Sequence, residues 1–410
     1  MKRGAAMPFI MVVVLIDMLS IGLIVPVLPA LVGEFTSDPA EQTWWYGVVT
    51  FSFALASFFG APVLGALSDR FGRRPVLLIG FCGLALNFFA TAMASALWML
   101  IASRIVGGVT QANAAVANAY VPDITPPEER ARRFGLLGAM FGIGFILGPV
   151  MGGLLGDIDL RLPFWVAGAL TLVNFAYGLL VLPESLPAER RRPVTWRAGN
   201  PLLSLKELTQ LHGVGPLVAV LALSGLAQFT LYTTWVLHNS FKFGWGPKEN
   251  GLSLFVVGVV SAVVQGGLIG WLLKRMPSWR LALLGLASST LAYIGWGAAT
   301  AGWVMYVVIV ANVLGNTIAA TMNSIVSGAA DAREQGRTMG ALSALNSLMA
   351  VVAPAIAAPL LGLVSHLPRG DWRLGLPMFF CALLQGLALL LAWAHFRRSG
   401  LARASQPSPA

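Results

Sequence analysis

The sequence contains few charged residues and very little cysteine or histidine. Asp, Glu, Lys and Arg make up 11% of its 410 residues, whereas a soluble domain carries roughly a quarter. The two cysteines, Cys82 and Cys381, lie far apart in apolar segments, which excludes a disulfide framework and a cysteine metal site. No phosphate-binding loop of the form GxxxxGK[ST] occurs, which argues against ATP as an energy source. No Ser/His/Asp arrangement or metal-ligand spacing stands out, so we expect neither an enzyme nor a metal site.

Apolar residues dominate instead. They make up 57% of the chain, the mean hydropathy is +0.76, and apolar runs of about 20 residues can cross a ~30 Å hydrocarbon layer. Only helices satisfy their backbone groups in lipid without closing a barrel. The sequence therefore predicts an all-α membrane protein of twelve transmembrane helices, over residues 9–33, 44–68, 74–94, 97–122, 131–156, 161–182, 212–238, 249–273, 280–299, 302–328, 336–362 and 374–396.

The net charge of +10 and the pI near 10.2 follow from membrane topology. Most of the 27 Lys and Arg residues lie in the N-terminus, in alternate loops, in the central linker and in the C-terminal tail. The positive-inside rule then places both termini in the cytoplasm. No nucleic-acid partner is needed to explain the charge, and we expect the short N-terminus to be a retained signal anchor.

The chain divides into two similar halves. Residues 183–211 are rich in Pro, Arg and polar residues, which predicts an exposed cytoplasmic linker between six-helix bundles at 1–182 and 212–396, followed by a tail at 397–410. Gly135 precedes Pro149 by the same spacing as Gly340 precedes Pro354. Chance similarity between Gly/Ala-rich helices is the alternative. Two pseudo-symmetric bundles in parallel orientation place a substrate site between the halves at mid-membrane.

Asp17 is the one carboxylate well inside a predicted span. A charge at mid-membrane faces the bundle interior or a water-filled cavity, and burial favours its protonated form, which makes Asp17 a candidate proton carrier. A structural carboxylate bonded to a neighbouring helix is the alternative. Arg104 is its cationic counterpart in the fourth predicted helix.

Amide and aromatic side chains recur at helical spacing in several spans. Arg104, Gln111 and Asn118 share one helix face. A cavity lined by amides and aromatics suits a bulky, mostly apolar solute, whereas the alternative is that these groups join helices to one another. The candidate cavity residues are Asn87, Gln111, Asn118, Gln228, Tyr232, Trp235, Asn312, Asn316 and Asn346.

Two glycine-containing motifs stand out. The loop "GALSDRFGRR" places Gly65, Asp69, Arg70, Gly72, Arg73 and Arg74 between apolar runs. In the fifth predicted helix, "GIGFILGPVMGG" spaces glycines every four residues, which lets another helix approach closely, and Pro149 stiffens or kinks that helix. The residues of this second motif are Gly144, Gly148, Pro149, Gly152 and Gly153.

The first loop resembles motif A of the major facilitator superfamily. Arg104 sits where motif B of that superfamily places its arginine, and the glycine-rich helix resembles motif C of its drug antiporters. "DMLSIGLIVPVLP" and "EQGRTMGAL" look most like the tetracycline/proton antiporters, a group with twelve helices. The resemblance covers essentially the whole chain.

The resemblance implies proton-coupled efflux of a small amphipathic or hydrophobic drug by alternating access, with Asp17 and Arg104 in proton coupling. Motif A would be a gate on the cytoplasmic face, in which Asp69 meets the start of the eleventh helix and Arg73 pairs with Asp123. The implied protein is a monomer of the bacterial inner membrane that is driven by the proton gradient and needs no cofactor. An importer or facilitator of a metabolite, and a non-transporting receptor or scaffold, are the alternatives.

Three departures from the tetracycline exporters bear on the substrate. Membrane carboxylates of their third and ninth helices correspond to Asn87 and Ser289 here, and a glutamine of their second helix corresponds to Ser57. These changes favour a neutral or hydrophobic compound over a charged metal chelate.

Overall fold

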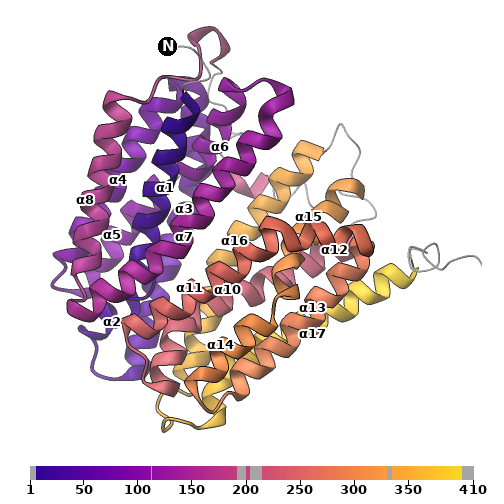
Figure 1. Ribbon diagram of the computed structural model, residues 1–410. Coiled ribbons are helices and arrows are strands. Elements are labelled where there is room, and N and C mark those ends of the chain that lie inside the picture. The colour runs from indigo at the N-terminus through magenta and orange to yellow at the C-terminus, as the bar shows by residue number, and fades with distance from the viewer. Residues whose placement is uncertain (1–5, 112, 192–199, 204–214, 330–334, 399–410) are drawn as a thin grey trace, which may run out of the picture. The chain divides into compact units, whose positions relative to one another are not determined.

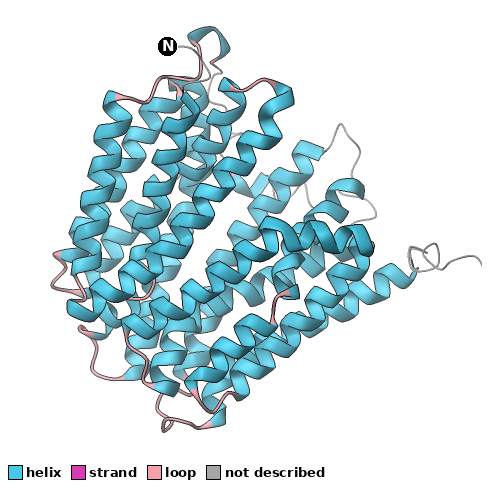
Figure 2. Cartoon of the chain, in the orientation of Figure 1, coloured by secondary structure: helices cyan, strands magenta, loops and turns pink. Residues whose placement is uncertain are grey.

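The computed structural model describes the chain except residues 1–5, 112, 192–199, 204–214, 330–334 and 399–410. Its described residues form helices joined by short turns, with no strand among them (Figure 2). The contacts divide the chain into two compact units: unit 1 comprises Met1–Pro201 with Gly244–Gly258, and unit 2 comprises Leu202–Phe243 with Val259–Ala410. Each unit is described separately below.

Unit 1 contains eight helices that begin before the linker (Figure 1). They are α1 (Ala6–Ile24), α2 (Leu28–Gly33), α3 (Pro39–Phe71), α4 (Arg73–Ala92), α5 (Leu97–Thr110), α6 (Asn113–Ile124), α7 (Arg130–Ile158) and α8 (Leu162–Leu180). The principal packing pairs are α1 with α7 and α8, α3 with α5, and α4 with α5 and α8. Ile10, Leu77, Phe81 and Tyr120 are fully buried in the core that these helices share.

The remaining helices begin after the linker. They are α10 (Gly215–Phe243), α11 (Pro247–Val263), the π-helical turn η4 (Val264–Leu268), α12 (Ile269–Arg275), α13 (Ser278–Ala298), α14 (Gly302–Ala311), η5 (Leu314–Thr317), α15 (Ile318–Ala329), α16 (Gln335–Gly362), η6 (Trp372–Gly375) and α17 (Leu376–Arg398). In unit 2, α10 packs on α16 and α17, and α13 packs on α17. Unit 1 pairs its corresponding spans in the same way, which supports the internal repeat.

Helix ends follow local sequence signals. The carboxylate of Asp38 accepts hydrogen bonds from the amides of Ala40 and Glu41 at 2.8 and 2.9 Å, and Pro39 occupies the first turn of α3. These contacts satisfy amides that the helix itself cannot. Gly72 ends α3 with a φ of 107°, a conformation that L side chains rarely adopt.

Most predicted spans are continuous helices, and three are broken. The predicted span 9–33 is divided into α1 and α2 by a turn at residues 25–27. Ten helical stretches of the described residues are long and apolar enough to cross a membrane, and Gly302–Ala311 with Leu314–Val326 forms an eleventh span bent by 48°. The predicted span 97–122 is divided into α5 and α6, because Gln111 leaves helical geometry at ψ 69°. Together these stretches match the twelve predicted spans.

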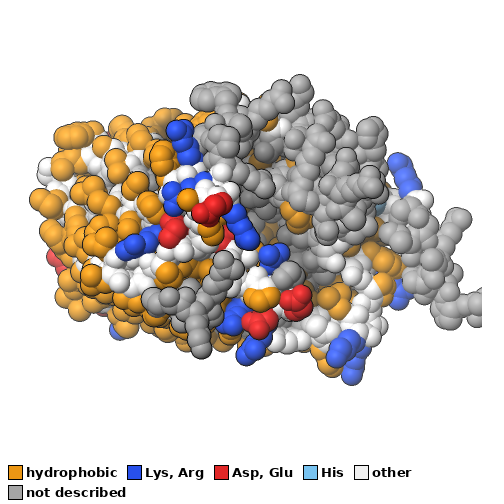
Figure 3. Space-filling view, turned by 90° about the horizontal axis from the view of Figure 1, so that it is seen from above, with side chains coloured by type: hydrophobic (Ala, Val, Ile, Leu, Met, Phe, Trp, Pro, Cys, Tyr) orange, Lys and Arg blue, Asp and Glu red, His pale blue; other side chains and the backbone are white. Residues whose placement is uncertain are grey.

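The outer surface carries many large apolar side chains. Trp98, Ile158 and Leu180 are 69%, 77% and 81% exposed, and apolar side chains cover the flanks in Figure 3. Lys, Arg, Asp and Glu side chains gather instead on the face seen in that figure. Exposed apolar surface on this scale suits lipid rather than water, so the chain is a multi-pass membrane protein.

Candidate functional site

The turn between α3 and α4 brings the charged residues of motif A together. Arg73 begins α4 immediately after Gly72 and is 9% exposed. Its guanidinium lies 3.2 Å from Oδ2 of Asp123 and 2.6 Å from Oδ1 of Asp69, and it donates to Oγ of Ser68 at 2.6 Å. Arg73 therefore joins the ends of α3, α4 and α6 and forms the ion pair with Asp123 that the resemblance implies.

The first residues of the linker cap this turn. Glu184 accepts hydrogen bonds from the backbone amides of Arg73 at 2.8 Å and Arg74 at 3.2 Å. Its carboxylate thus neutralises the positive N-terminal end of α4. Ser185 donates to Asp123 at 3.2 Å, and Tyr120 donates to the carbonyl of Pro183 at 2.7 Å.

The sequence had predicted an exposed linker from residue 183, whereas Ser185 and Leu186 are 8% and 6% exposed. The beginning of the linker is part of the motif A structure, and the reason is that Glu184 supplies an acceptor that α4 lacks. The signal in the sequence was a carboxylate between Pro183 and Ser185, directly after a span. Its partners could not be found without the tertiary structure.

The other motif A residues differ in their surroundings. Arg74 donates to the carbonyls of Gly178 and Leu179 at the end of α8, which suits the negative end of a helix. The exposed side chain of Arg70 lies over the ring of Phe71, 5.1 Å from its centroid. Nothing lies within 4 Å of a Cβ built on Gly65, and nothing in the structure explains that glycine. The predicted contact of Asp69 with the eleventh helix would join the two units and stays a prediction.

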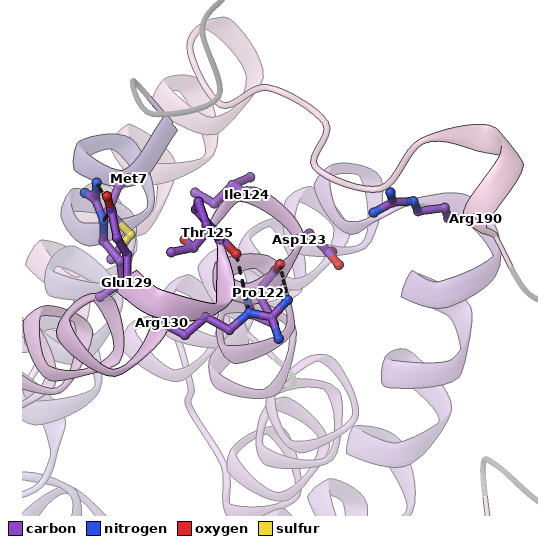
Figure 4. Close-up of a pocket in the computed structure, with 10 residues that line it drawn as sticks. Met7, Pro122, Asp123, Ile124, Thr125, Glu129, Arg130 and Arg190 are labelled. Carbon is purple, nitrogen blue, oxygen red and sulfur yellow. Dashed lines mark hydrogen bonds and ion pairs between the residues drawn. The ribbon is translucent and has the colours of Figure 1, made fainter.

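A pocket of about 520 Å³ adjoins the same network (Figure 4). Arg130 lines this pocket and donates to the carbonyls of Thr125 and Pro122, both at 3.3 Å, where α6 ends. The pocket was not predicted, and it contains none of the candidate substrate residues. Its lining residues are Met7, Pro122, Asp123, Ile124, Thr125, Pro126, Glu129, Arg130, Arg133 and Arg190.

Motif C forms a close contact between α7 and α1. A Cβ on Gly148 would lie 2.7 Å from the α-carbon of Gly22, and one on Gly152 would collide with the carbonyl of Leu23. Gly144 of α7 faces Met18 of α1. Met18 directly follows Asp17, a residue that is 3% exposed. The glycines therefore hold α7 against the segment that carries the buried carboxylate.

Gly153, which follows Gly152 in motif C, faces α11 rather than α1. A Cβ on Gly153 would lie 2.6 Å from the carbonyl of Pro247 and 3.0 Å from the α-carbon of Gly251, both in the part of α11 that clusters with unit 1. The adjacent Pro149 lies inside α7, and its carbonyl is 2.5 Å from a Cβ built on Gly251. Motif C thus contacts α1 on one side and α11 on the other.

Arg104 lies at the junction of α3, α4 and α5. It is 3% exposed and belongs to the buried stripe of α5, with Leu100, Ser103, Gly107 and Gly108. Its guanidinium lies 5.9 Å from the ring centroid of Phe53 in α3. Asn87 of α4 is 1% exposed and packs on Gly107. Arg104 lies on α5, which packs mainly on α3 and α4. Asp17 lies on α1, which packs mainly on α7 and α8. A role of Arg104 in proton coupling stays a prediction.

The other candidate cavity residues occur in both units. In unit 1, Gln111 is half-buried at the end of α5 and Asn118 is exposed on α6. In unit 2, Tyr232 is 52% exposed, whereas Trp235 is buried edge-on against Trp296, with ring centroids 5.1 Å apart. That the two sets of residues line one cavity stays a prediction. The remaining members are the half-buried Gln228, Asn312 and Asn316 and the exposed Asn346.

Two of the unit 2 amides have serine partners. Asn312 Oδ1 accepts hydrogen bonds from Ser288 at 3.0 Å and Ser289 at 3.4 Å. Asn316 Oδ1 accepts one from Ser261 at 2.8 Å. These bonds join the bent span to α13 and α11, so that the break in the helix is held by side chains.

Comparisons with known proteins agree with these features. The family model described as Major Facilitator Superfamily matches residues 10–354. The chain is 36% identical over 384 residues to tetracycline resistance protein, class C, of Escherichia coli, covering 93% of this chain and 96% of that protein. It is 33% identical over 382 residues to tetracycline resistance protein, class D, of Salmonella ordonez, covering 93% and 95%.

A solved structure shows the same fold. The crystal structure of the human organic anion transporter MFSD10 (TETRAN) has a TM-score of 0.69 at 22% identity. The match covers 96% of this chain and 100% of that one.

Proposed function

Because the chain belongs to the major facilitator superfamily and, within it, to the family of the tetracycline resistance proteins, we propose that it exports a small amphipathic or hydrophobic drug-like compound in exchange for protons. Tetracycline is the first compound to test, since the class C and class D relatives described above, both above 30% identity, are named for resistance to it. The proposal needs no cofactor besides the proton gradient and describes a monomer of a bacterial inner membrane, with both termini in the cytoplasm.

The buried carboxylate of Asp17 is the observation that carries the proposal. It is 3% exposed in α1, and α7 packs against the same stretch of α1 through Gly144 and Gly148. A change in the charge of Asp17 alters the cost of burying that stretch. Protonation is thereby coupled to the packing of α1 on α7, which is what an antiporter requires of its proton site.

The motif A network supplies the second part of the mechanism. The ion pairs of Arg73 with Asp69 and Asp123 join the ends of α3, α4 and α6. The hydrogen bond from the Arg73 amide to Glu184 links them to the segment after α8. A set of helix ends linked by charge moves as one body, as alternating access requires. Opening and closing of this end of unit 1 would gate the substrate path.

Proton release from acid-loaded inside-out vesicles tests the proposal. We expect tetracycline to collapse the gradient with the natural protein and to have no effect with Asp17→Asn. The matched control is Asp157→Asn, which removes an exposed carboxylate near the C-terminal end of α7. This variant should keep proton release. Vesicles in which Asp17→Asn releases protons as the natural protein does would contradict proton exchange through Asp17.

A further inference from the structure

Among the residues that the structure describes, none is hydrogen-bonded to the Nε and Nη2 edge of the buried Arg104 guanidinium. These two groups form the fork with which arginine binds a carboxylate through parallel hydrogen bonds. None of the salt bridges in the described part of the chain includes Arg104. The site thus holds a cation whose strongest recognition edge is unused.

Asn87 adds a third unused donor beside it. Both amide atoms of Asn87 are buried without a hydrogen-bond partner among the described residues. The side chain packs on Gly107, one turn after Arg104 on the same buried face of α5, with the amide carbon 2.7 Å from a Cβ built there. The neighbour supplied by α3 is the ring of Phe53, 5.9 Å from the guanidinium carbon to the ring centroid, which cannot accept the hydrogen bonds of a planar guanidinium fork as a carboxylate would.

The equivalent place in unit 2 is satisfied by the protein itself. Asn312 precedes Gly315 by three residues, as Arg104 precedes Gly107, and the side chains of Ser289 and Asn312 meet Gly315 as Asn87 meets Gly107. There, Ser288 and Ser289 donate to Asn312. The repeat therefore places a polar group at this position in both halves, but only the unit 1 position combines a cation with unused donors.

We propose that Arg104 and Asn87 bind an acidic group of the exported compound, such as a carboxylate, sulfonate or enolate. Buried polar groups in proteins are almost always paired, and a guanidinium fork with an amide donor matches the oxygens of such an acid. The inference rests on the proposed function, because it names the chemical class of its substrate. It replaces the neutral compound expected from the sequence with one that carries an acidic group, because the buried guanidinium near Asn87, that of Arg104, has its Nε and Nη2 edge unpaired among the described residues. It predicts that an anionic aromatic compound binds better than its neutral counterpart.

Binding of a matched pair of compounds to the purified full chain tests the inference. The probes are 1-naphthylacetate and 1-naphthylacetamide, which share a ring and differ in charge at pH 7.5. Affinity is measured from the dose-dependent gain in monodisperse protein that survives heating in detergent. We expect the acid to bind at least about tenfold more tightly than the amide, as charge-assisted hydrogen bonds allow.

Three variants separate the fork from a general effect of charge. Arg104→Gln should weaken binding of the acid by about tenfold and so abolish the preference for it over the amide. Asn87→Asp should do the same with Arg104 in place, because the new carboxylate occupies its fork. Ser289→Asp adds the same charge at the equivalent position of unit 2 and should keep the preference.

Three results overturn the inference: equal affinity of the natural protein for both compounds, no measurable affinity for the acid, or a preference that persists in Arg104→Gln. The result is separable from the antiport test. Tetracycline-driven proton release without a preference for the acid refutes the anion site alone. A preference for the acid without proton release refutes the antiport alone.

Discussion

Arg73 and Asp123 form an ion pair, Nε to Oδ2 at 3.2 Å, that joins the start of α4 to the end of α6. Their side chains are 11% and 21% exposed. Partial burial reduces screening by water, so this pair is worth more than a surface pair.

A double-mutant cycle measures that pair. We expect Arg73→Gln and Asp123→Asn to show a coupling free energy of about 1–2 kcal/mol in detergent unfolding, because each change removes the same contact. The control is the pair Arg133 and Glu129, whose side chains are 26% and 50% exposed. Its coupling should be below about 0.5 kcal/mol. Equal coupling in the two cycles would contradict a structural role for the motif A pair.

Gly72→Ala should destabilise unit 1 by about 1–3 kcal/mol, measured as a loss of free energy of unfolding. The residue has a φ of 107°, and a Cβ there would collide with the carboxylate of Glu184. The loss caused by Gly72→Ala should be smaller in a Glu184→Ala background, where the collision is gone. Gly65→Ala in the same motif has open space around it and should cost nothing measurable.

The contact between α1 and α7 makes a similar prediction at Gly148. Gly148→Ala forces two backbones apart, because its Cβ would lie 2.7 Å from the α-carbon of Gly22, and we expect a cost of about 1–3 kcal/mol. Gly142→Ala in the same helix meets nothing within 4 Å and should be neutral or slightly stabilising. Comparable thermal unfolding of the two variants would show that the close contact is not required.

Lys242→Met tests a buried cation in unit 2. Lys242 is 3% exposed and donates to the carbonyl of Gly297 at 2.6 Å, which joins α10 to α13. Removing the donor leaves that carbonyl unpaired, so the expected cost in unfolding free energy is about 1–3 kcal/mol. Lys248→Met, at an exposed position, should change it by less than about 0.5 kcal/mol. A Lys242→Met protein as stable as the natural protein would show that the hydrogen bond from Lys242 to Gly297 does not stabilise the fold.

Much of the fold was accessible from the sequence because lipid imposes a simple rule. A span must be apolar, helical and about 20 residues long, so the apolar runs located all twelve spans. The breaks inside them were less accessible. Pro26 lies in the turn that divides the span 9–33, whereas Gln111 ends α5 and the span 302–328 bends by 48° with no proline at either break.

The candidate site was accessible only in part. The pair of Arg73 with Asp123 was expected from resemblance, and the small residues of motif C from their spacing. The role of Glu184 was missed, because its partners lie about 110 positions away in the chain. The contact of Asn87 with Gly107, and the unused edge of Arg104 beside it, were equally invisible.

The sequence by itself determined that this chain crosses a membrane many times, which residues are too polar for lipid and which helix faces are small enough for close packing. These properties depend on composition and helical periodicity, which are local. The tertiary structure alone decided which polar groups are paired and which are left unpaired. Pairing depends on the meeting of distant segments, and in a buried site the difference between the two outcomes separates a structural contact from a binding site.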